Sequence, residues 1–161
     1  MADSLLPRIQ FVLILGRQGC GKTTLAARLA SLWDPWRVYV HDPWGDPMFD
    51  GYHRCSLTNP PAMNRTLVIL DEAHKFLRSN GGYRAQWVHD LVWGGRHLSC
   101  SRVFVSLRPQ MLNRDITSQA RDIYIGHLSG SKDIEYCVRE WGDECSHARG
   151  LPRGSFLHVS F

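Results

Sequence analysis

The feature that most restricts the fold of this chain is a glycine-rich segment, GRQGCGKT at residues 16–23, which lies between two different apolar patterns. Residues 9–15 before it form a nearly continuous apolar run, which is typical of a strand buried on both faces of a sheet. Residues 22–33 after it carry apolar side chains at helical spacing. Glycines let backbone N–H groups curl around phosphate oxygens, and a helix N-terminus adds a positive end. The segment therefore predicts a phosphate-binding loop.

The spacing of this segment, GxxxxGKT, is that of a Walker A motif. We expect Lys22 to reach the β- and γ-phosphates of ATP and the Thr23 hydroxyl to bind Mg²⁺, so ATP and Mg²⁺ are the expected cofactors. A chance glycine turn is the alternative, but the flanking strand and helix patterns argue against it. The predicted nucleotide-binding residues are Gly16, Arg17, Gln18, Gly19, Cys20, Gly21, Lys22, Thr23 and Thr24.

A second apolar run, at residues 66–70, ends in the acidic pair Asp71 and Glu72. Ligands of open α/β sheets bind at the carboxyl ends of the strands, where this pair is expected to lie. Asp71 is expected to hold Mg²⁺ through water, and Glu72 to polarise the attacking water. An acidic pair after a strand is by itself usually a solvated turn, but a preceding Walker A motif favours the catalytic interpretation. Together the two motifs predict ATP hydrolysis.

Strand patterns and helix patterns alternate along the rest of the chain. Further strands are expected at residues 37–41, 102–107, 122–127 and 155–161, and further helices at residues 84–93 and 131–141. This alternation predicts a three-layer α/β fold of the P-loop NTPase type (RecA/ASCE-like), with a mainly parallel central sheet flanked by helices. A length of 161 residues predicts one domain over residues 1–161.

The five cysteines include no CxxC pair, so reduced, buried thiols are expected rather than disulfides. Cys137, Cys145 and His147 fit no common zinc spacing. Most of the six tryptophans are expected in the core, with Trp44 in a loop. The net charge of +4 permits nucleic-acid binding without requiring it. The longest apolar run is too short for a membrane span and no signal-peptide pattern begins the chain, so a cytoplasmic protein is expected.

Several later segments follow one another in an order that carries a family resemblance. They are VYVHDPWGD at 38–46, DEAHKF at 71–76, GRH at 95–97, SLRP at 106–109, ITSQA at 116–120 and LSGSKDIE at 128–135. By itself, the sequence DEAH is the motif of one group of helicases. Those helicases have two tandem motor domains, which do not fit in 161 residues, so we do not favour this interpretation. With the Walker A motif, these segments resemble the FtsK/HerA superfamily of DNA-pumping ATPases. The closest resemblance is to a minimal viral or phage genome-packaging ATPase.

The resemblance implies a motor that packages a viral genome into a capsid. It implies a hexameric or pentameric ring with backbone contacts to double-stranded DNA, a docking partner at the capsid or a membrane vertex, and a location in the host cytoplasm or with the virion. In the family, an arginine of a neighbouring subunit completes the site. Arg96 matches this arginine best by position, with Arg108 and Arg121 as alternatives. A solvated arginine at a helix end is the other interpretation of Arg96.

One position departs from the family pattern. The family's polar sensor glutamine, which helps to sense the γ-phosphate, falls on Leu107 here. Ser106 and Arg108 are the main candidates to replace it, followed by Gln110, and weak sensing is the alternative.

The loop after the acidic pair offers candidate DNA contacts. Arg78, Tyr83 and Arg84 combine positive charge with an aromatic ring, which suits contacts to DNA phosphates. An ordinary solvated loop is the alternative for residues 78–84.

Two other functions remain open at the level of the sequence. A small P-loop nucleotide or metabolite kinase suits the length, although Asp71, Glu72 and the lack of an arginine-rich lid speak against it. A nucleotide-gated assembly module with weak ATPase activity is consistent with Leu107.

Overall fold

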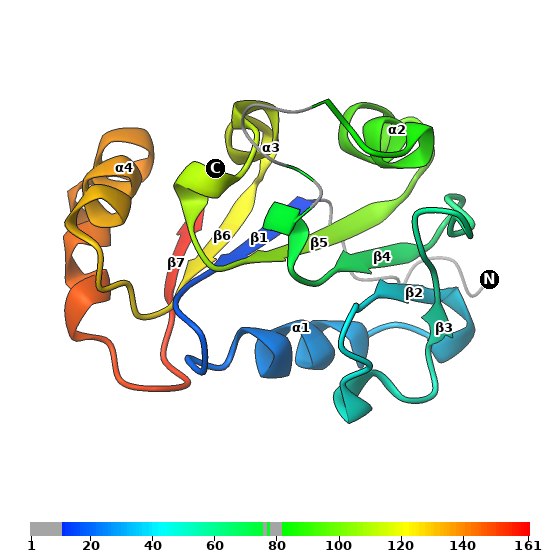
Figure 1. Cartoon of the computed structure of the whole chain (residues 1–161), viewed down its shortest axis with the longest axis horizontal. Helices are drawn as coiled ribbons and strands as arrows, with labels where there is room; N and C mark the ends of the chain where they lie inside the picture. The colour runs from blue at the N-terminus through cyan, green and yellow to red at the C-terminus, as the bar shows by residue number, and fades with distance from the viewer. Residues whose placement is uncertain (1–10, 76, 78–81) are drawn as a thin grey trace.

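The computed structural model describes residues 11–75, 77 and 82–161 (Figure 1). Their strands form one sheet in the order β3-β2-β4-β5-β1-β6-β7. Every neighbouring pair is parallel except β6 and β7, which are antiparallel. The strands are β1 (Phe11–Leu15), β2 (Val38–His41), β3 (His53–Arg54), β4 (Leu67–Leu70), β5 (Ser101–Ser106), β6 (Asp122–Ile125) and β7 (Leu157–Ser160). The predicted α/β class with a mainly parallel sheet is thus confirmed.

Helices cover both faces of this sheet, which gives three layers. They are α1 (Lys22–Ala30), α2 (Gln86–Gly94), α3 (Arg114–Gln119) and α4 (Ser131–Trp141). Helix α1 packs on one face, and α2, α3 and α4 lie over the other (Figure 1). Within the described part of the chain, no helix has the length and apolar character needed to cross a membrane.

The central strands are apolar at nearly every position because both of their faces are buried. In β1, Phe11, Leu13 and Leu15 belong to the core beneath α2, α3 and α4, whereas Val12 and Ile14 belong to the core against α1. All five side chains are at most 3% exposed. Burial of one such side chain contributes about 1.5–3 kcal/mol, so the first strand is fixed on both sides. The phosphate loop therefore starts from a strand that is buried on both faces of the sheet.

Some boundaries differ from the sequence-based expectations. Helix α1 ends at Ala30 rather than at residue 33. The Trp33 side chain is nevertheless buried in the core between α1 and the sheet. Strand β7 covers only Leu157–Ser160 of the expected strand. The two-residue strand β3 was not predicted, because two residues carry no alternating pattern.

The buried thiols were predicted correctly, and the tryptophans only in part. All five cysteines are buried and free. The expectation that most tryptophans lie in the core is wrong for half of them. Trp33, Trp87 and Trp141 are buried, whereas Trp36, Trp44 and Trp93 are more than 50% exposed. Trp93 is exposed because it follows Val92 on α2, and one helical residue turns the side chain about 100° away from the core.

Candidate nucleotide-binding site

The predicted phosphate loop joins the carboxyl end of β1 to the N-terminus of α1 (Figure 1). Its three glycines, Gly16, Gly19 and Gly21, have φ angles of 148°, 79° and 103°. Residues other than glycine rarely adopt such φ angles, so the backbone conformation of the loop requires glycine at these three positions. At Gly16 there is also no space, because a Cβ atom would lie 2.6 Å from the Cys20 Sγ atom.

Backbone hydrogen bonds hold this loop against two distant segments. The Arg17 N–H donates to the His127 carbonyl oxygen at 2.8 Å, beyond the end of β6. The Gly154 N–H, which precedes β7, donates to the Cys20 carbonyl oxygen at 2.9 Å. The loop is thus fixed from both sides, which keeps its remaining N–H groups in place for an anion.

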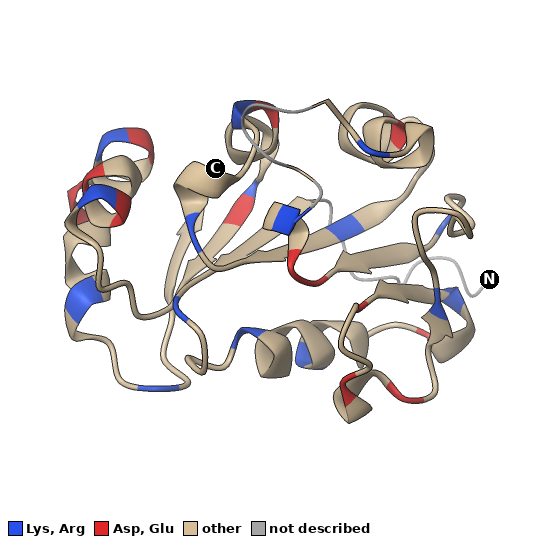
Figure 2. Ribbon diagram, in the orientation of Figure 1, with Lys and Arg blue, Asp and Glu red and all other residues tan. Residues whose placement is uncertain are grey.

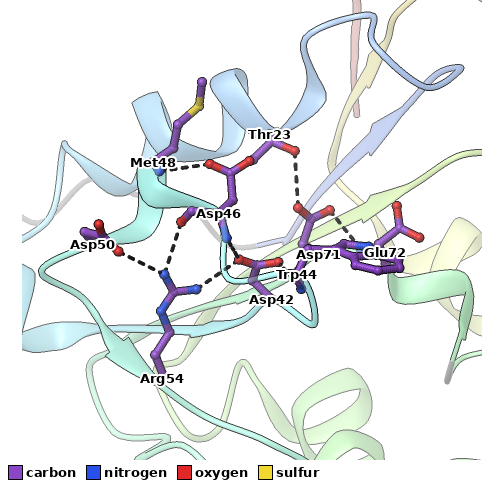
Figure 3. Close-up of polar contacts among 9 residues, drawn as sticks. All are labelled: Thr23, Asp42, Trp44, Asp46, Met48, Asp50, Arg54, Asp71 and Glu72. Carbon is purple, nitrogen blue, oxygen red and sulfur yellow. Dashed lines mark hydrogen bonds and ion pairs between the residues drawn. The ribbon is translucent and has the colours of Figure 1, made fainter.

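Lys22 and Thr23 open helix α1 and connect the loop to the acidic pair. The Lys22 ammonium group donates to the Arg17 carbonyl oxygen at 2.9 Å, and the side chain is 9% exposed. The Thr23 hydroxyl donates to Asp71 Oδ2 at 3.2 Å (Figure 3). Burial lowers the pKa of the Lys22 ammonium group and raises the pKa of the Asp71 carboxyl group, because both charged forms lose hydration.

The hydroxyl and the carboxylate are a suitable donor set for Mg²⁺. Both are hard oxygen ligands, and Mg²⁺ typically takes one or two protein ligands together with phosphate oxygens and water. Thr23 and Asp71 lie next to each other at the end of the phosphate loop, where nucleotide phosphates would complete such a shell. Among the described residues, no cluster of three or more His, Cys, Asp or Glu side chains forms an all-protein metal site.

Glu72 stands in an unusual backbone conformation. Its φ angle is 54°, and its N–H donates to Asp71 Oδ1 at 2.8 Å. This left-handed conformation costs about 1–3 kcal/mol for a residue other than glycine, and such strain is concentrated at functional sites. The Glu72 carboxylate oxygen Oε2 lies 3.2 Å from Lys75 Nζ and 3.4 Å from His74 Nε2. Lys75 Nζ in turn lies 4.2 Å from the ring centroid of Trp44. The predicted site residues did not include these three neighbours.

A third carboxylate, that of Asp42, lies at the same edge of the sheet. Asp42 follows β2 as Asp71 follows β4, and the Asp71 N–H donates to the His41 carbonyl oxygen at 2.9 Å. The Asp42 side chain is 1% exposed and accepts from Arg54 Nη1 at 3.0 Å and from the Trp44 N–H at 2.9 Å (Figure 3). It also accepts from the Asp46 N–H. An acid directly after the second predicted strand is the sequence signal that could have identified it.

These contacts belong to an acidic loop between β2 and β3 (Figure 2). Besides its contact with Asp42, Arg54 donates to the Asp46 carbonyl oxygen at 3.1 Å and lies 3.4 Å from Asp50 Oδ1. The Arg54 guanidinium group therefore contacts three acidic residues of this loop, Asp42, Asp46 and Asp50. Asp42 is the one that also binds the Trp44 N–H.

The sensor candidates lie at the end of β5 and just after it, and β5 lies between β4 and β1 in the sheet. Ser106 pairs in register with Leu15 of β1, and its hydroxyl donates to the Arg108 carbonyl oxygen at 3.3 Å. Leu107 and Arg108 line an open pocket of about 380 Å³ together with Arg17 and Gln18.

The Arg108 and Gln110 side chains are both held by residues of α4. Arg108 forms an ion pair with Asp133, with 2.8 Å between Nε and Oδ2. Gln110 donates to the Lys132 carbonyl oxygen at 2.5 Å. Of these two side chains, only Arg108 lines the pocket beside the phosphate loop.

The candidate arginine finger lies far from the phosphate loop of its own chain. Arg96 and Arg121 are exposed and line a cavity with Phe11, the first residue of β1. The phosphate loop follows the other end of β1, so the two features lie at opposite edges of the sheet. Within one subunit, Arg96 does not complete the site.

The candidate DNA contacts are only partly described. Arg78 lies outside the described residues, and Arg84 is exposed. The Tyr83 hydroxyl donates to Asp115 Oδ2 at 3.4 Å and accepts from Trp93 Nε1 at 3.2 Å. Tyr83 is thus held between α2 and α3.

The sheet order, the phosphate loop and the acidic pair at the end of β4 together define the fold of a P-loop NTPase. No family model and no curated protein sequence matches this chain. Among solved structures, it is similar to the genome packaging NTPase B204 from Sulfolobus turreted icosahedral virus 2 in complex with AMPPCP. The TM-score is 0.77 at 14% identity, over 94% of this chain and 92% of that chain.

Two further structures share the fold. The N-terminal domain of zonular occludens toxin from Neisseria meningitidis has a TM-score of 0.56 at 15% identity, over 95% of this chain and 94% of that chain. The pCW3 conjugation coupling protein TcpA has a TM-score of 0.66 at 16% identity, over 94% of this chain and 57% of that chain. The resemblance to a viral genome-packaging ATPase is thus confirmed at the level of the fold.

The close contact at Gly16 leads to a stability prediction. Gly16→Ala is expected to lower the free energy of unfolding by about 1–3 kcal/mol, because the added Cβ would overlap with the Cys20 sulfur. Equilibrium unfolding in urea measures the change. Gly150→Ala is the matched control, since a Cβ there meets no atom within 4 Å. Equal unfolding midpoints for the two variants would contradict the prediction.

Proposed function

We propose that this chain is an ATPase of the FtsK/HerA type that moves double-stranded DNA and packages a viral genome. The observation that carries the proposal is the phosphate loop next to Asp71 and Glu72, on a fold shared with a genome packaging NTPase over 94% of the chain. That neighbour was solved with AMPPCP, an analogue of ATP.

The proposed binding step uses residues that already lie together. The N–H groups of the phosphate loop bind phosphate oxygens, and Lys22 exchanges its bond with the Arg17 carbonyl oxygen for the β- and γ-phosphates. Thr23 and Asp71 hold Mg²⁺, which, when bound, neutralises charge on the phosphates. Burial of Lys22 strengthens its attraction to the phosphates, because less water screens the charges.

In the proposed hydrolysis step, Glu72 polarises the water that attacks the γ-phosphate. Lys75 and His74 both contact Oε2 of this carboxylate. We therefore assign the water to Oε1. Arg108, next to Arg17 and Gln18, and Ser106 are the proposed sensors of the γ-phosphate in place of the glutamine that Leu107 replaces.

The site is completed in this proposal by a second subunit. Arg96 lies at the edge of the sheet opposite to the phosphate loop, so a neighbouring copy has to supply its charge. There it would stabilise the charge that develops on the transferred phosphoryl group. A ring of five or six copies provides such contacts all around.

The proposed DNA contacts and location follow from the family resemblance. Arg84 and Tyr83, together with Arg78, would contact phosphates in the ring without reading the sequence of bases. The motor would act in the host cytoplasm, or associated with the virion, through a docking protein at the capsid or a membrane vertex.

The test is ATP turnover with and without double-stranded DNA over a series of protein concentrations. We expect release of inorganic phosphate, stimulation by DNA, and a loss of this stimulation with added salt, because phosphate contacts release counterions. Specific activity should fall on dilution if a second subunit completes the site. Phosphoryl transfer to a nucleoside instead of water would overturn the proposal in favour of a small kinase. Binding of ATP without turnover, with or without DNA, would favour an assembly module.

Arg96 itself is tested by mixing two inactive proteins. Arg96→Ala should remain folded and bind ATP but hydrolyse it slowly. Mixed with Glu72→Gln, it should regain part of the turnover, because some interfaces then combine an intact Glu72 with an intact Arg96. A specific activity that stays constant across dilution, together with normal turnover by Arg96→Ala, would remove the arginine finger from the proposal.

A further inference from the structure

The cavity that Arg96 and Arg121 line has a volume of about 480 Å³ and opens at the amino ends of β1, β5 and β6. Its lining includes Phe11 of β1, Arg102 of β5 and Arg121, which precedes β6. The phosphate loop follows the carboxyl end of β1, so the cavity lies at the opposite edge of the sheet. It is therefore a separate feature of the same chain.

The wall of this cavity contains a buried guanidinium group. Arg102 is 4% exposed, and the centre of its guanidinium group lies 4.4 Å from the centroid of the Phe11 ring. Its only hydrogen bonds within the described residues go to the carbonyl oxygens of Val92, at 3.3 Å, and Cys100, at 3.5 Å. Among the residues that the structure describes, Nε has no hydrogen-bond partner and no carboxylate forms an ion pair with this arginine. A buried charge without a counterion is costly, so its presence requires an explanation.

The backbone is shaped to hold this guanidinium group in place. A Cβ atom at Gly95 would lie 2.1 Å from Arg102 Nη1 and 2.7 Å from its Cζ atom. The group thus lies between the bare backbone of Gly95 and the ring of Phe11. A fixed, planar guanidinium group is well suited to bind two oxygens of one phosphate group.

The surroundings carry an excess of positive charge. Arg96 and Arg121 are exposed at the same cavity, and the Gln119 Nε2 amide is buried with no hydrogen-bond partner in the described part of the chain. Glu140 is the acidic residue of the lining, but its Oε1 already accepts from Arg139 Nε at 3.1 Å. Burial lowers the pKa of the Arg102 guanidinium group, and the nearby charge of Arg96 adds to this effect. A bound anion would offset the repulsion between these arginines and supply the counterion that the buried guanidinium group lacks among the described residues.

We propose that this cavity binds a small phosphorylated ligand, with Arg102 as its anchor and Arg96, Arg121 and Gln119 around it. A small ligand is favoured over duplex DNA because the anchoring guanidinium group is 4% exposed and lies inside a concave site. The phosphates of a DNA duplex lie on a convex surface and cannot reach a guanidinium group inside such a cavity. Arg96 is also the proposed arginine finger for a neighbouring copy, whereas the anchor Arg102 and Gln119 have no part in the proposed hydrolysis of ATP.

The test uses pyrophosphate as the probe and the full chain carrying Lys22→Ala, which disables the phosphate loop. Isothermal titration calorimetry should show one pyrophosphate site in this background. Adding Arg102→Met should weaken binding at least about tenfold, because a charge-assisted hydrogen-bond donor is lost from a buried site. Arg28→Ala is the matched control, an exposed arginine on α1 at the other face of the sheet. It should leave the affinity unchanged.

Thermal unfolding separates a binding role of Arg102 from a structural one. Without ligand, Arg102→Met should unfold at the same temperature as its parent or higher, because it removes an unpaired buried charge. Pyrophosphate should raise the unfolding temperature of the parent and not that of the variant. If Arg102→Met does not fold, Arg121→Ala carries the binding test, with an expected loss of several-fold.

Three results would overturn the proposal. The first is the absence of any pyrophosphate binding in the Lys22→Ala background. The second is equal binding by Arg102→Met, Arg121→Ala and Arg28→Ala. The third is binding of a DNA duplex that depends on Arg102 while pyrophosphate does not bind, which would assign the cavity to nucleic acid.

Discussion

Glu72→Gln is expected to reduce the rate of ATP hydrolysis at least about 10²-fold while leaving the affinity for ATP unchanged. The glutamine amide has nearly the same shape as the carboxylate but cannot accept a proton from the attacking water. The contacts of Lys22, Thr23 and Asp71, which are proposed to bind the phosphates and Mg²⁺, do not involve the Glu72 side chain. Phosphate release under single-turnover conditions measures the rate, and calorimetry measures binding.

Two further variants make this experiment specific. Glu135→Gln changes the same chemical group at an exposed position of α4 and should hydrolyse ATP normally. Asp71→Asn should instead weaken the binding of ATP that depends on Mg²⁺, since Asp71 lies next to the Thr23 hydroxyl. Turnover near that of the wild type by Glu72→Gln would show that another group polarises the water.

Lys22→Ala is expected to weaken ATP binding by about 10²-fold, enough to abolish tight binding. The lysine is 9% exposed and already extends over the loop to the Arg17 carbonyl oxygen, so its charge faces the space where the phosphates are expected. Removing it leaves the phosphate charge without its strongest partner. Calorimetry with ATP and Mg²⁺ measures the loss.

The control for Lys22→Ala is Lys132→Ala, which removes the same charge from an exposed position at the start of α4. It should bind ATP as the wild type does. Circular dichroism of both variants checks that the fold is retained. An unchanged affinity for Lys22→Ala would refute the assignment of the phosphate site, whatever the fold of the chain.

The fold and the phosphate loop were predictable because their signals are local. Continuous apolar runs predicted the central strands, since β1, β4 and β5 are buried on both faces. The glycines at 16, 19 and 21 are required by backbone angles that hardly any other residue adopts. Strand order depends on long-range pairing, for which a single sequence carries no comparable signal.

The parts of the site that escaped prediction are contacts between distant segments. Trp44 follows β2, while Lys75 and Glu72 follow β4, so their contact exists only because these two strands are neighbours in the sheet. The same holds for Arg96, whose distance from its own phosphate loop follows from the direction of the strands. Spacing along the sequence does not encode either relation.

The burial of the cysteines has a practical consequence for studies of assembly. Burial raises the pKa of Cys55 to about 12 and that of Cys100 to about 11, so almost none of either is present as the reactive thiolate at neutral pH. The other three cysteines are buried as well. Short treatment with maleimide should therefore leave the native chain nearly unlabelled. In an Arg96→Cys variant, the introduced thiol would be the one that reacts, and a fluorophore or a crosslinker placed there would report how closely neighbouring copies approach.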